Sequence, residues 1–211
     1  MFSVSYLAIL YLPFFLNPQK LVNLSLETPE AAKNFPSHKS SHSDYLEVKA
    51  RIQDFLKGTE NGHAEVILSS NDLNVLNEER GSNKIVKKSD SFKILEYYKI
   101  SEDFIYNRCL IYPAINAAGY SEYTELIKFE SKNNTIKEIR KTIVSKPPSI
   151  QYIFQKITGI FYKSPLIRSS IVYLALRTVS SDCGYSVDDI DNLISKVKSI
   201  EIRNSELIIK S

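Results

Sequence analysis

The sequence has no tryptophan, one methionine, two cysteines, three histidines and six glycines among its 211 residues. The glycines are scattered, so the sequence has none of the glycine-rich loops that hold nucleotide phosphates. It also has no G-x-S-x-G segment and no H-E-x-x-H segment, which excludes two common hydrolase signatures. Eight prolines and no internal repeat exclude collagen-like and solenoid proteins. The remaining composition, 43% hydrophobic and 24% charged, is that of an ordinary globular domain.

Few residues are available for metal binding or covalent catalysis. Cys109 and Cys183 match no metal or redox spacing, and both a disulfide between them and two unbonded thiols remain open. His38 and His42 are four residues apart, as helical metal ligands are, but the neighbouring proline and serines favour a solvated linker. A Cys109–His63 pair would form a thiolate nucleophile, although a strand cysteine is usually a small buried apolar residue. We therefore expect no catalytic residue, no metal site and no cofactor.

The charges of the chain are nearly balanced. Residues 44–211 carry 24 basic and 22 acidic side chains, whereas a dedicated nucleic-acid-binding domain is strongly basic. We therefore expect no nucleic-acid partner. The acidic group Asp188, Asp189 and Asp191 lacks the spacing of a calcium loop and is typical of a helix N-terminus.

The N-terminal part of the chain predicts a membrane leader followed by a linker. Residues 1–16 are almost all apolar, and the uncharged run is short for a spanning helix, which needs about 20 residues. It therefore fits a signal peptide or a membrane anchor, and the lack of a small-residue cleavage site after Leu16 favours an uncleaved anchor. A buried N-terminal helix is the alternative. Residues 17–43 are rich in Ser, Pro, Asn, Lys and His, which predicts a flexible linker.

The remaining residues, 44–211, are enough for a single globular domain, and their hydrophobic periodicity predicts several amphipathic helices. The first opens with Asp44 and Glu47 as a capping pair and ends near residue 57. A short helix capped by Ser70 follows, and Gly81 ends it. Others start at Ser149, at 164–165 and at the Ser186–Asp189 capping pair. The expected buried stripe of the first helix is Tyr45, Val48, Ile52, Phe55 and Leu56.

Between and after these helices the pattern predicts strands. Residues 135–144 also fit helical spacing, so that segment is ambiguous. At the C-terminus, apolar residues alternate on both sides of Asn204-Ser205, which predicts a terminal β-hairpin. The fold class is therefore α+β, a mostly antiparallel sheet packed against amphipathic helices. The other expected strands are 63–69, 84–88, 92–100, 104–112 and 123–130.

The apolar helix pair in residues 149–178 is the feature best suited to bind a ligand. Two apolar stripes that face a curved sheet would leave a groove for an acyl chain or another apolar ligand. The alternative is that both are simply core helices. The candidate ligand-binding residues on this pair are Phe154, Ile157, Phe161, Ile171 and Val172.

Residues 66–76 read Val-Ile-Leu-Ser-Ser-Asn-Asp-Leu-Asn-Val-Leu, a strand followed by a Leu-Ser pair and an Asp-Leu-Asn helix start. This segment resembles one in the YpmS-like and YceB-like bacterial envelope proteins, uncharacterised N-terminally anchored α+β proteins. Residues 200–209 are similar to their terminal hairpin, with Ser205 in place of the usual glycine. The resemblance implies an extracytoplasmic domain on a membrane tether and supplies no catalytic residues. In this reading Leu73 and Leu76 hold the short helix on the sheet, and Asn74 bonds to a nearby loop.

These observations together predict a non-catalytic, membrane-anchored extracytoplasmic domain, in the periplasm or at the cell surface. Its membrane contact is the N-terminal apolar segment, and it binds a lipid-like ligand or an envelope protein partner. One alternative is a membrane-associated enzyme with a non-classical site. Another is a structural subunit that packs against a partner through the helices of residues 149–178.

Overall fold

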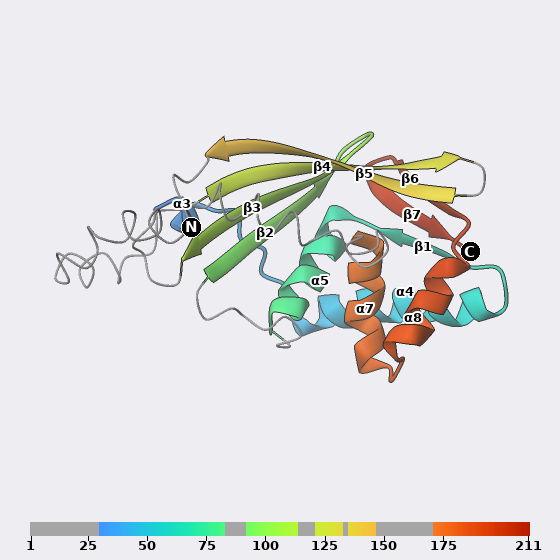
Figure 1. Cartoon of the computed structure of the whole chain (residues 1–211). Helices are drawn as coiled ribbons and strands as arrows, with labels where there is room; N and C mark the ends of the chain where they lie inside the picture. The colour runs from blue at the N-terminus through green and yellow to red at the C-terminus, as the bar shows by residue number, and fades with distance from the viewer. Residues whose placement is uncertain (1–29, 83–91, 114–120, 133–134, 147–170) are drawn as a thin grey trace, which may run out of the picture.

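The computed structural model describes residues 30–82, 92–113, 121–132, 135–146 and 171–211 (Figure 1). The predicted α+β class and the C-terminal hairpin are confirmed. The predicted leader, the strand at 84–88 and the helix that begins at Ser149 lie outside the described residues. In chain order the elements are α3 (Glu30–Lys33), α4 (His42–Glu60), β1 (Glu65–Leu68), α5 (Ser70–Ser82), β2 (Phe92–Ile100), β3 (Ile105–Pro113), β4 (Ser121–Lys132), β5 (Thr135–Lys146), α7 (Ile171–Asp182), α8 (Val187–Ser195), β6 (Ser199–Arg203) and β7 (Glu206–Lys210).

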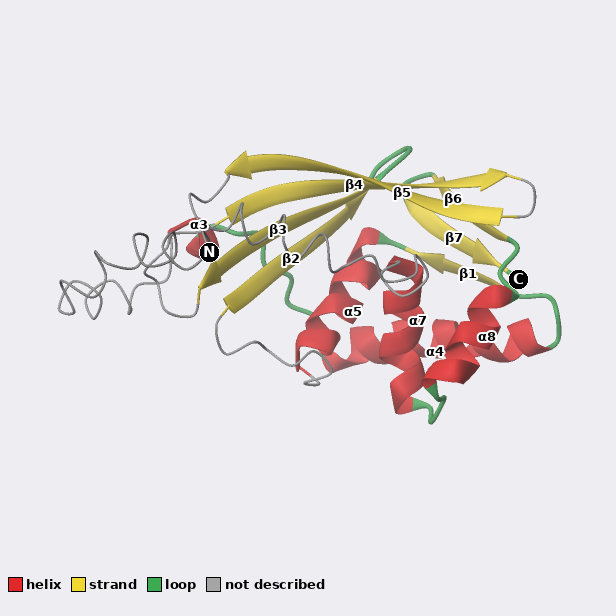
Figure 2. Cartoon of the chain, in the orientation of Figure 1, coloured by secondary structure: helices red, strands yellow, loops and turns green. Residues whose placement is uncertain are grey.

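The described strands form two antiparallel sheets. A three-stranded sheet has the order β1-β7-β6, and a four-stranded sheet has the order β2-β3-β4-β5. Helices α4, α5, α7 and α8 lie together on one side of the sheets, and one end of the four-stranded sheet extends beyond them (Figure 2). The segment 135–144, ambiguous in the sequence, is a strand, because β5 pairs with β4 along its whole length.

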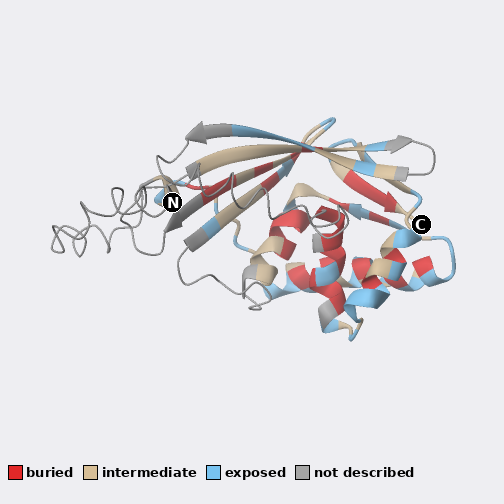
Figure 3. Cartoon of the chain, viewed as in Figure 1, coloured by how far each residue is buried: buried red, intermediate tan, exposed pale blue. Residues whose placement is uncertain are grey.

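Helix α4 buries the stripe that its periodicity predicts. It packs against β1, α5 and α7 at the centre of the core, where the buried residues gather (Figure 3). Burying a large apolar side chain contributes about 1.5–3 kcal/mol, so this stripe accounts for much of the attachment of α4. The residues of the stripe, each at most 3% exposed, are Tyr45, Val48, Ile52, Phe55 and Leu56.

The helix caps were predicted correctly at α8 and shifted by a few residues elsewhere. Ser186 and Asp189 form the expected reciprocal capping box of α8. Helix α4 instead begins after Ser41, whose hydroxyl accepts from the Asp44 N–H while the Asp44 carboxylate accepts from the Ser41 N–H. The predicted Asp44–Glu47 pair is therefore wrong, because Asp44 is the third residue of the helix rather than its cap.

Helix α5 begins one residue earlier and extends further than predicted. The Ser69 hydroxyl accepts from the Asp72 N–H, and the Asp72 carboxylate accepts from the Ser69 N–H, so Ser69 rather than Ser70 caps the helix. Arg51 of α4 donates to the other Asp72 oxygen at 2.5 Å, which ties the start of α5 to α4. Gly81 lies inside the helix, which reaches Ser82.

Asn74 joins α5 to the outer edge of the four-stranded sheet. Its Nδ2 donates to the Tyr98 carbonyl and its Oδ1 accepts from the Tyr98 N–H, both at 2.8 Å. The expected loop partner of Asn74 is therefore wrong, because the partner is the backbone of strand β2. Leu73 and Leu76 are buried beneath the helix, as the sequence predicts.

Two further side chains of α5 lie on the same helical face as Asn74, since residues four and three apart share a face. The Ser70 hydroxyl accepts from the Ile100 N–H at 2.7 Å, and Asn77 Nδ2 donates to the Glu96 carbonyl at 3.2 Å. These bonds occupy backbone groups of β2 that an edge strand otherwise offers to another chain.

The C-terminal hairpin of β6 and β7 turns through two residues with left-handed backbone. Asn204 has φ 54° and Ser205 has φ 61°, as a two-residue type I′ turn requires. Asn tolerates this region well, whereas Ser205 occupies it without the freedom of glycine. Strand β7 is the middle strand of its sheet, so Leu207, Ile208 and Ile209 are all buried.

The end of the predicted linker contacts the domain. Phe35, 7% exposed, packs on Leu110 of β3, and the Arg108 guanidinium lies 5.2 Å from the centre of its ring. Further along, the Ser40 N–H and hydroxyl both donate to the Glu78 carboxylate of α5. Residues 35–40 thus run past the β2 edge from the outer side of the sheet to the start of α4.

The link between α5 and β2 predicts a large effect of Asn74→Ala. This change leaves the N–H and carbonyl of buried Tyr98 unpaired, at a cost of about 1–3 kcal/mol for each group. We expect a loss of about 2–4 kcal/mol in the free energy of unfolding measured by denaturant titration.

The control is Asn71→Ala, on the exposed side of the same helix, which we expect to change stability by no more than about 0.5 kcal/mol. Equal effects of the two substitutions would show that Asn74 does not hold the strand edge.

Candidate functional site

The four-stranded sheet has an inner face, by which we mean the side that faces the helices. The strand register aligns side chains of neighbouring strands in rows across this face. One row is apolar and belongs to the core: Ile100, Ile105 and Ile127 are each at most 3% exposed. This row anchors the sheet to α4, α5 and α7.

The next two rows of the inner face, toward the end of the sheet that extends beyond the helices, are largely polar. The first aligns Tyr98, Asn107 and Glu125, and the second aligns Glu96, Cys109 and Tyr123. Tyr98, Asn107 and Cys109 are nevertheless each at most 4% exposed, and polar groups are costly to bury without hydrogen bonds. These rows, together with charged side chains that contact them from β5 and α5, form what we call the polar cluster. Its residues are Glu96, Tyr98, Asn107, Cys109, Tyr123, Glu125, Glu138, Arg140 and, on α5, Arg80.

The two arginines of the polar cluster are held by its carboxylates. Arg140 donates to Glu138 at 2.5 Å and to Glu125 at 3.1 Å, and Arg80 lies 3.9 Å from Glu96. Burial lowers the pKa of the Arg140 guanidinium, but the charges of Glu138 and Glu125 outweigh this and raise it above its usual value. Both arginines are therefore already paired with carboxylates.

Glu138 also fixes the start of α7 on the inner face. Its second carboxylate oxygen accepts from the Ile171 N–H at 3.3 Å, at the positive end of the helix dipole. The first residues of α7 therefore lie next to the polar cluster. Of the ligand-binding residues predicted from the sequence, Ile171 and Val172 are here, 3% and 2% exposed, in the core. Phe154, Ile157 and Phe161 lie outside the described residues.

Asn107 is the most unusual member of the polar cluster. The residue is 4% exposed, and within the described part of the chain its Oδ1 atom is buried without a hydrogen-bond partner. An unpaired buried acceptor costs about 1–3 kcal/mol, so natural proteins rarely keep one without a reason. Asn107 lines neither of the two hollows described below, so its unpaired oxygen is an internal feature of the inner face.

The hydroxyl and thiol groups of the polar cluster are held in their neutral forms. Burial raises the pKa of the Cys109 thiol, and the Glu96 carboxylate, whose Oε1 is 3.7 Å from Sγ, raises it further. Burial likewise raises the pKa values of Tyr98 and Tyr123. A neutral thiol is a weak nucleophile, so Cys109 is not set up for attack at neutral pH.

The structure does not bring together the catalytic pair considered in the sequence. His63 is exposed in the turn between α4 and β1, whereas Cys109 lies on the inner face of the other sheet. Cys109 and Cys183 are unbonded, and Cys183 contacts Gln53 of α4. Among the described residues, no three His, Cys, Asp or Glu side chains are grouped as metal ligands.

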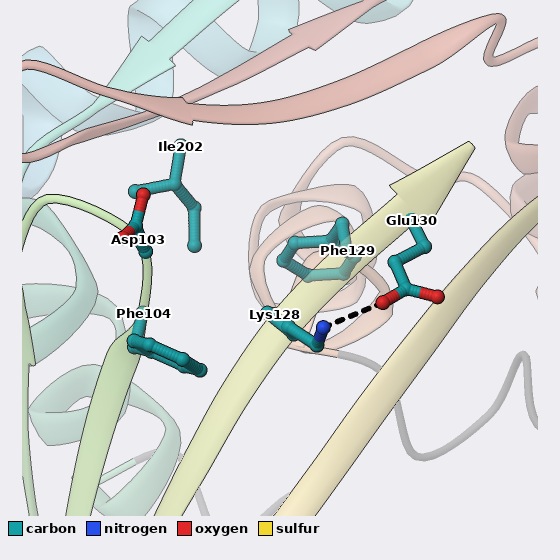
Figure 4. Close-up of a pocket in the computed structure, with 6 residues that line it drawn as sticks. All are labelled: Asp103, Phe104, Lys128, Phe129, Glu130 and Ile202. Atoms are coloured by element: carbon teal, nitrogen blue, oxygen red, sulfur yellow. Dashed lines mark hydrogen bonds and ion pairs between the residues drawn. The ribbon is translucent and has the colours of Figure 1, made fainter.

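The surface of the described residues includes at least two hollows. Hollow 1, about 350 Å³, lies where β4 meets β6, and its Lys128 and Glu130 side chains are paired with each other (Figure 4). Its other lining residues are Asp103, Phe104, Phe129 and Ile202. Hollow 2, about 320 Å³, lies at the edge of β2, between α5 and residues 32–38.

Hollow 2 adjoins the polar cluster, because Glu96 belongs to both. Ile94, which precedes Glu96 on the inner face, is 57% exposed and lines the hollow with Phe35 and Pro36. His38 also lines it, and within the described residues its Nε2 atom is buried without a partner. Hollow 2 therefore combines an apolar wall with polar atoms available to a ligand.

Comparison of the chain with family models, curated proteins and solved structures gave no match. The resemblance to YpmS-like and YceB-like proteins thus stays a prediction from the sequence. None of the described helices is both long and apolar enough to cross a membrane.

The environments of the two thiols predict different reactivities toward Ellman's reagent in the folded protein. Cys109 is 1% exposed and has a raised pKa, whereas Cys183 is partly exposed. In a Cys183→Ser variant we expect no measurable reaction until denaturant is added, whereas a Cys109→Ser variant should react without it. Rapid reaction of folded Cys183→Ser would contradict the buried, protonated state of Cys109.

Proposed function

We propose that this chain is a membrane-tethered, extracytoplasmic binding domain that holds a lipid-like ligand in hollow 2 and directs the ligand's polar group to the polar cluster. The observation that carries the proposal is the continuity of the two through Glu96, which lines hollow 2 and contacts Cys109 on the inner face. An amphiphile needs an apolar surface next to a polar one, and this edge of the sheet offers both.

The size and lining of hollow 2 support a small apolar ligand or a single chain. Its volume of about 320 Å³ lies at the lower end of ligand pockets. Ile94, Phe35 and Pro36 supply apolar surface, and Ile94 is 57% exposed. Covering this side chain would remove apolar surface from water, which favours apolar binding.

The chemistry of the polar cluster supports binding rather than covalent catalysis. Its thiol is held in the protonated form, and its arginines are paired with carboxylates. His38, whose buried Nε2 atom has no partner among the described residues, lines hollow 2 and offers a hydrogen bond to a ligand without any chemical step.

The place where the N-terminal segment meets the domain also supports this proposal. Residues 35–38 form one wall of hollow 2. If residues 1–16 are a membrane anchor, the chain that follows the anchor lines this hollow at residues 35–38.

Native mass spectrometry of the detergent-solubilised full chain tests the proposal. We expect a bound species of lipid mass, and we expect Ile94→Glu to lose most of it, because the change puts a charge on the apolar wall. The matched control is Val187→Glu, at a 41% exposed position on α8, which should keep the ligand. Neither change should alter stability by more than about 0.5 kcal/mol.

Purification of the wild-type chain with no lipid, or equal lipid on both variants, would contradict lipid binding in hollow 2. A protein that co-purifies instead would support the other occupant predicted from the sequence, an envelope partner.

A further inference from the structure

The four-stranded sheet also has an outer face, by which we mean the side opposite helices α4, α5, α7 and α8 (Figure 2). Resting on the membrane tether of the proposed function, we propose that this outer face lies against an anionic lipid bilayer and is held there by its lysine side chains. Two observations support the proposal. The face carries an excess of positive charge, and the N-terminal segment joins the domain on it.

The strand register places four outer-face residues in one row across the sheet. Lys99 of β2 is opposite Tyr106, Tyr106 is opposite Leu126, and Leu126 is opposite Lys141 of β5. The row therefore has a lysine on each edge strand and a tyrosine and a leucine between them. Ile143, two residues along β5 on the same face, is 47% exposed and adds apolar surface. Tyrosine and lysine are suited to a membrane–water interface, because each has an apolar body and a polar tip.

The outer face has more basic than acidic side chains. Its strands carry five basic and two acidic described side chains on this side, an excess of three positive charges. Both acidic side chains are already paired with basic neighbours. The pairs are Arg108–Glu122 at 2.6 Å and Lys128–Glu130 at 2.5 Å.

Three lysines of the outer face remain available for another anion. Lys99, Lys137 and Lys141 are exposed and form no ion pair with a described carboxylate. The strands have the opposite balance on the inner face, where three glutamates accompany Arg140. The positive charge is therefore concentrated on one side of the sheet. Each basic side chain near an anionic membrane surface adds to the attraction, which acts over about one Debye length.

The N-terminal segment contacts this same face. Phe35 and the alanines of α3 pack against Leu95, Tyr97 and Leu110. Only residues 17–29 lie between the predicted anchor and α3, and they span at most about 45 Å when fully extended. If residues 1–16 are a membrane anchor, the outer face is therefore kept near the bilayer. Leu95 also lines hollow 2, so in this orientation the hollow lies at the border of the membrane contact.

Lysine labelling of the full-length chain in lipid nanodiscs tests the proposal. Discs of phosphatidylcholine alone are compared with discs that also contain phosphatidylglycerol, and the acetylation rate of each lysine is measured by mass spectrometry. We expect Lys99, Lys137 and Lys141 to react at least about fivefold more slowly in the anionic discs, and about 1 M salt to remove this protection. Lys57 of α4 and Lys196 after α8 are exposed controls, which should react equally in both kinds of disc.

A charge-reversed variant separates electrostatic attraction from other contacts. Lys99→Glu combined with Lys141→Glu reverses the charge at both ends of the row, so we expect the protection of Lys137 in anionic discs to fall at least about fivefold. The matched control is Lys57→Glu combined with Lys196→Glu, which changes the net charge equally and should leave Lys137 protected. All four positions are exposed, so both variants should keep the circular dichroism spectrum of the wild type.

Each outcome decides the proposal. Equal labelling of the outer-face lysines in neutral and anionic discs would overturn it and leave the membrane tether intact. Protection that survives the Lys99→Glu and Lys141→Glu changes would also overturn it, in favour of another occupant such as a second copy of the chain. A chain that inserts into neither kind of disc would overturn both the inference and the tether of the proposed function.

Discussion

The hydrogen bonds between helix α5 and the edge of β2 are the constraint on which the candidate site depends. Ser70, Asn74 and Asn77 bond to backbone groups of β2 that another strand would otherwise take. These bonds fix the position of β2 along helix α5. They leave the edge of β2 near Ile94 uncovered by α5. Hollow 2 forms there, between the end of the helix-covered edge and residues 32–38. The same contacts that stabilise the sheet therefore also determine where a ligand can enter.

Along the inner face of the four-stranded sheet, the side chains change from apolar in the core to polar at the candidate site. The row of Ile100, Ile105 and Ile127 packs against the helices and continues into Arg140 on β5. The polar rows beyond it hold Glu125, which pairs with Arg140, and the unpaired Asn107 acceptor. A fold that needed only stability would gain from apolar side chains in these rows, since buried polar groups without partners are unfavourable. The presence of this cluster beside hollow 2 is the basis of the binding hypothesis. Burial and the nearby Glu96 carboxylate raise the pKa of Cys109, so this thiol is suited to packing rather than to attack.

The sequence predicted most of the fold because its signals are local. The stripe of α4, the Ser186–Asp189 cap and the alternation around Asn204 each follow from residues within one turn or two strands. The caps of α4 and α5 were misplaced because several Ser and Asp residues stand within three positions of one another, and only the backbone shows which one bonds. The polar cluster could not be predicted, because it depends on the register of four strands and on the position of helix α5. Its signal in the sequence, polar residues at alternate positions of 96–98, 107–109 and 123–125, becomes meaningful only once these strands are aligned.

Photo-crosslinking with an amphiphile that carries a diazirine next to a hydroxyl head group tests the central claim most directly. The full-length protein in detergent is irradiated with the probe and its peptides are mapped by mass spectrometry. The account predicts crosslinks on the peptides that contain residues 35–38, 94–98 and 107–109, and their loss when unlabelled amphiphile competes. Crosslinks confined to hollow 1, at Phe104 and Phe129, or to the outer face of the four-stranded sheet would contradict it.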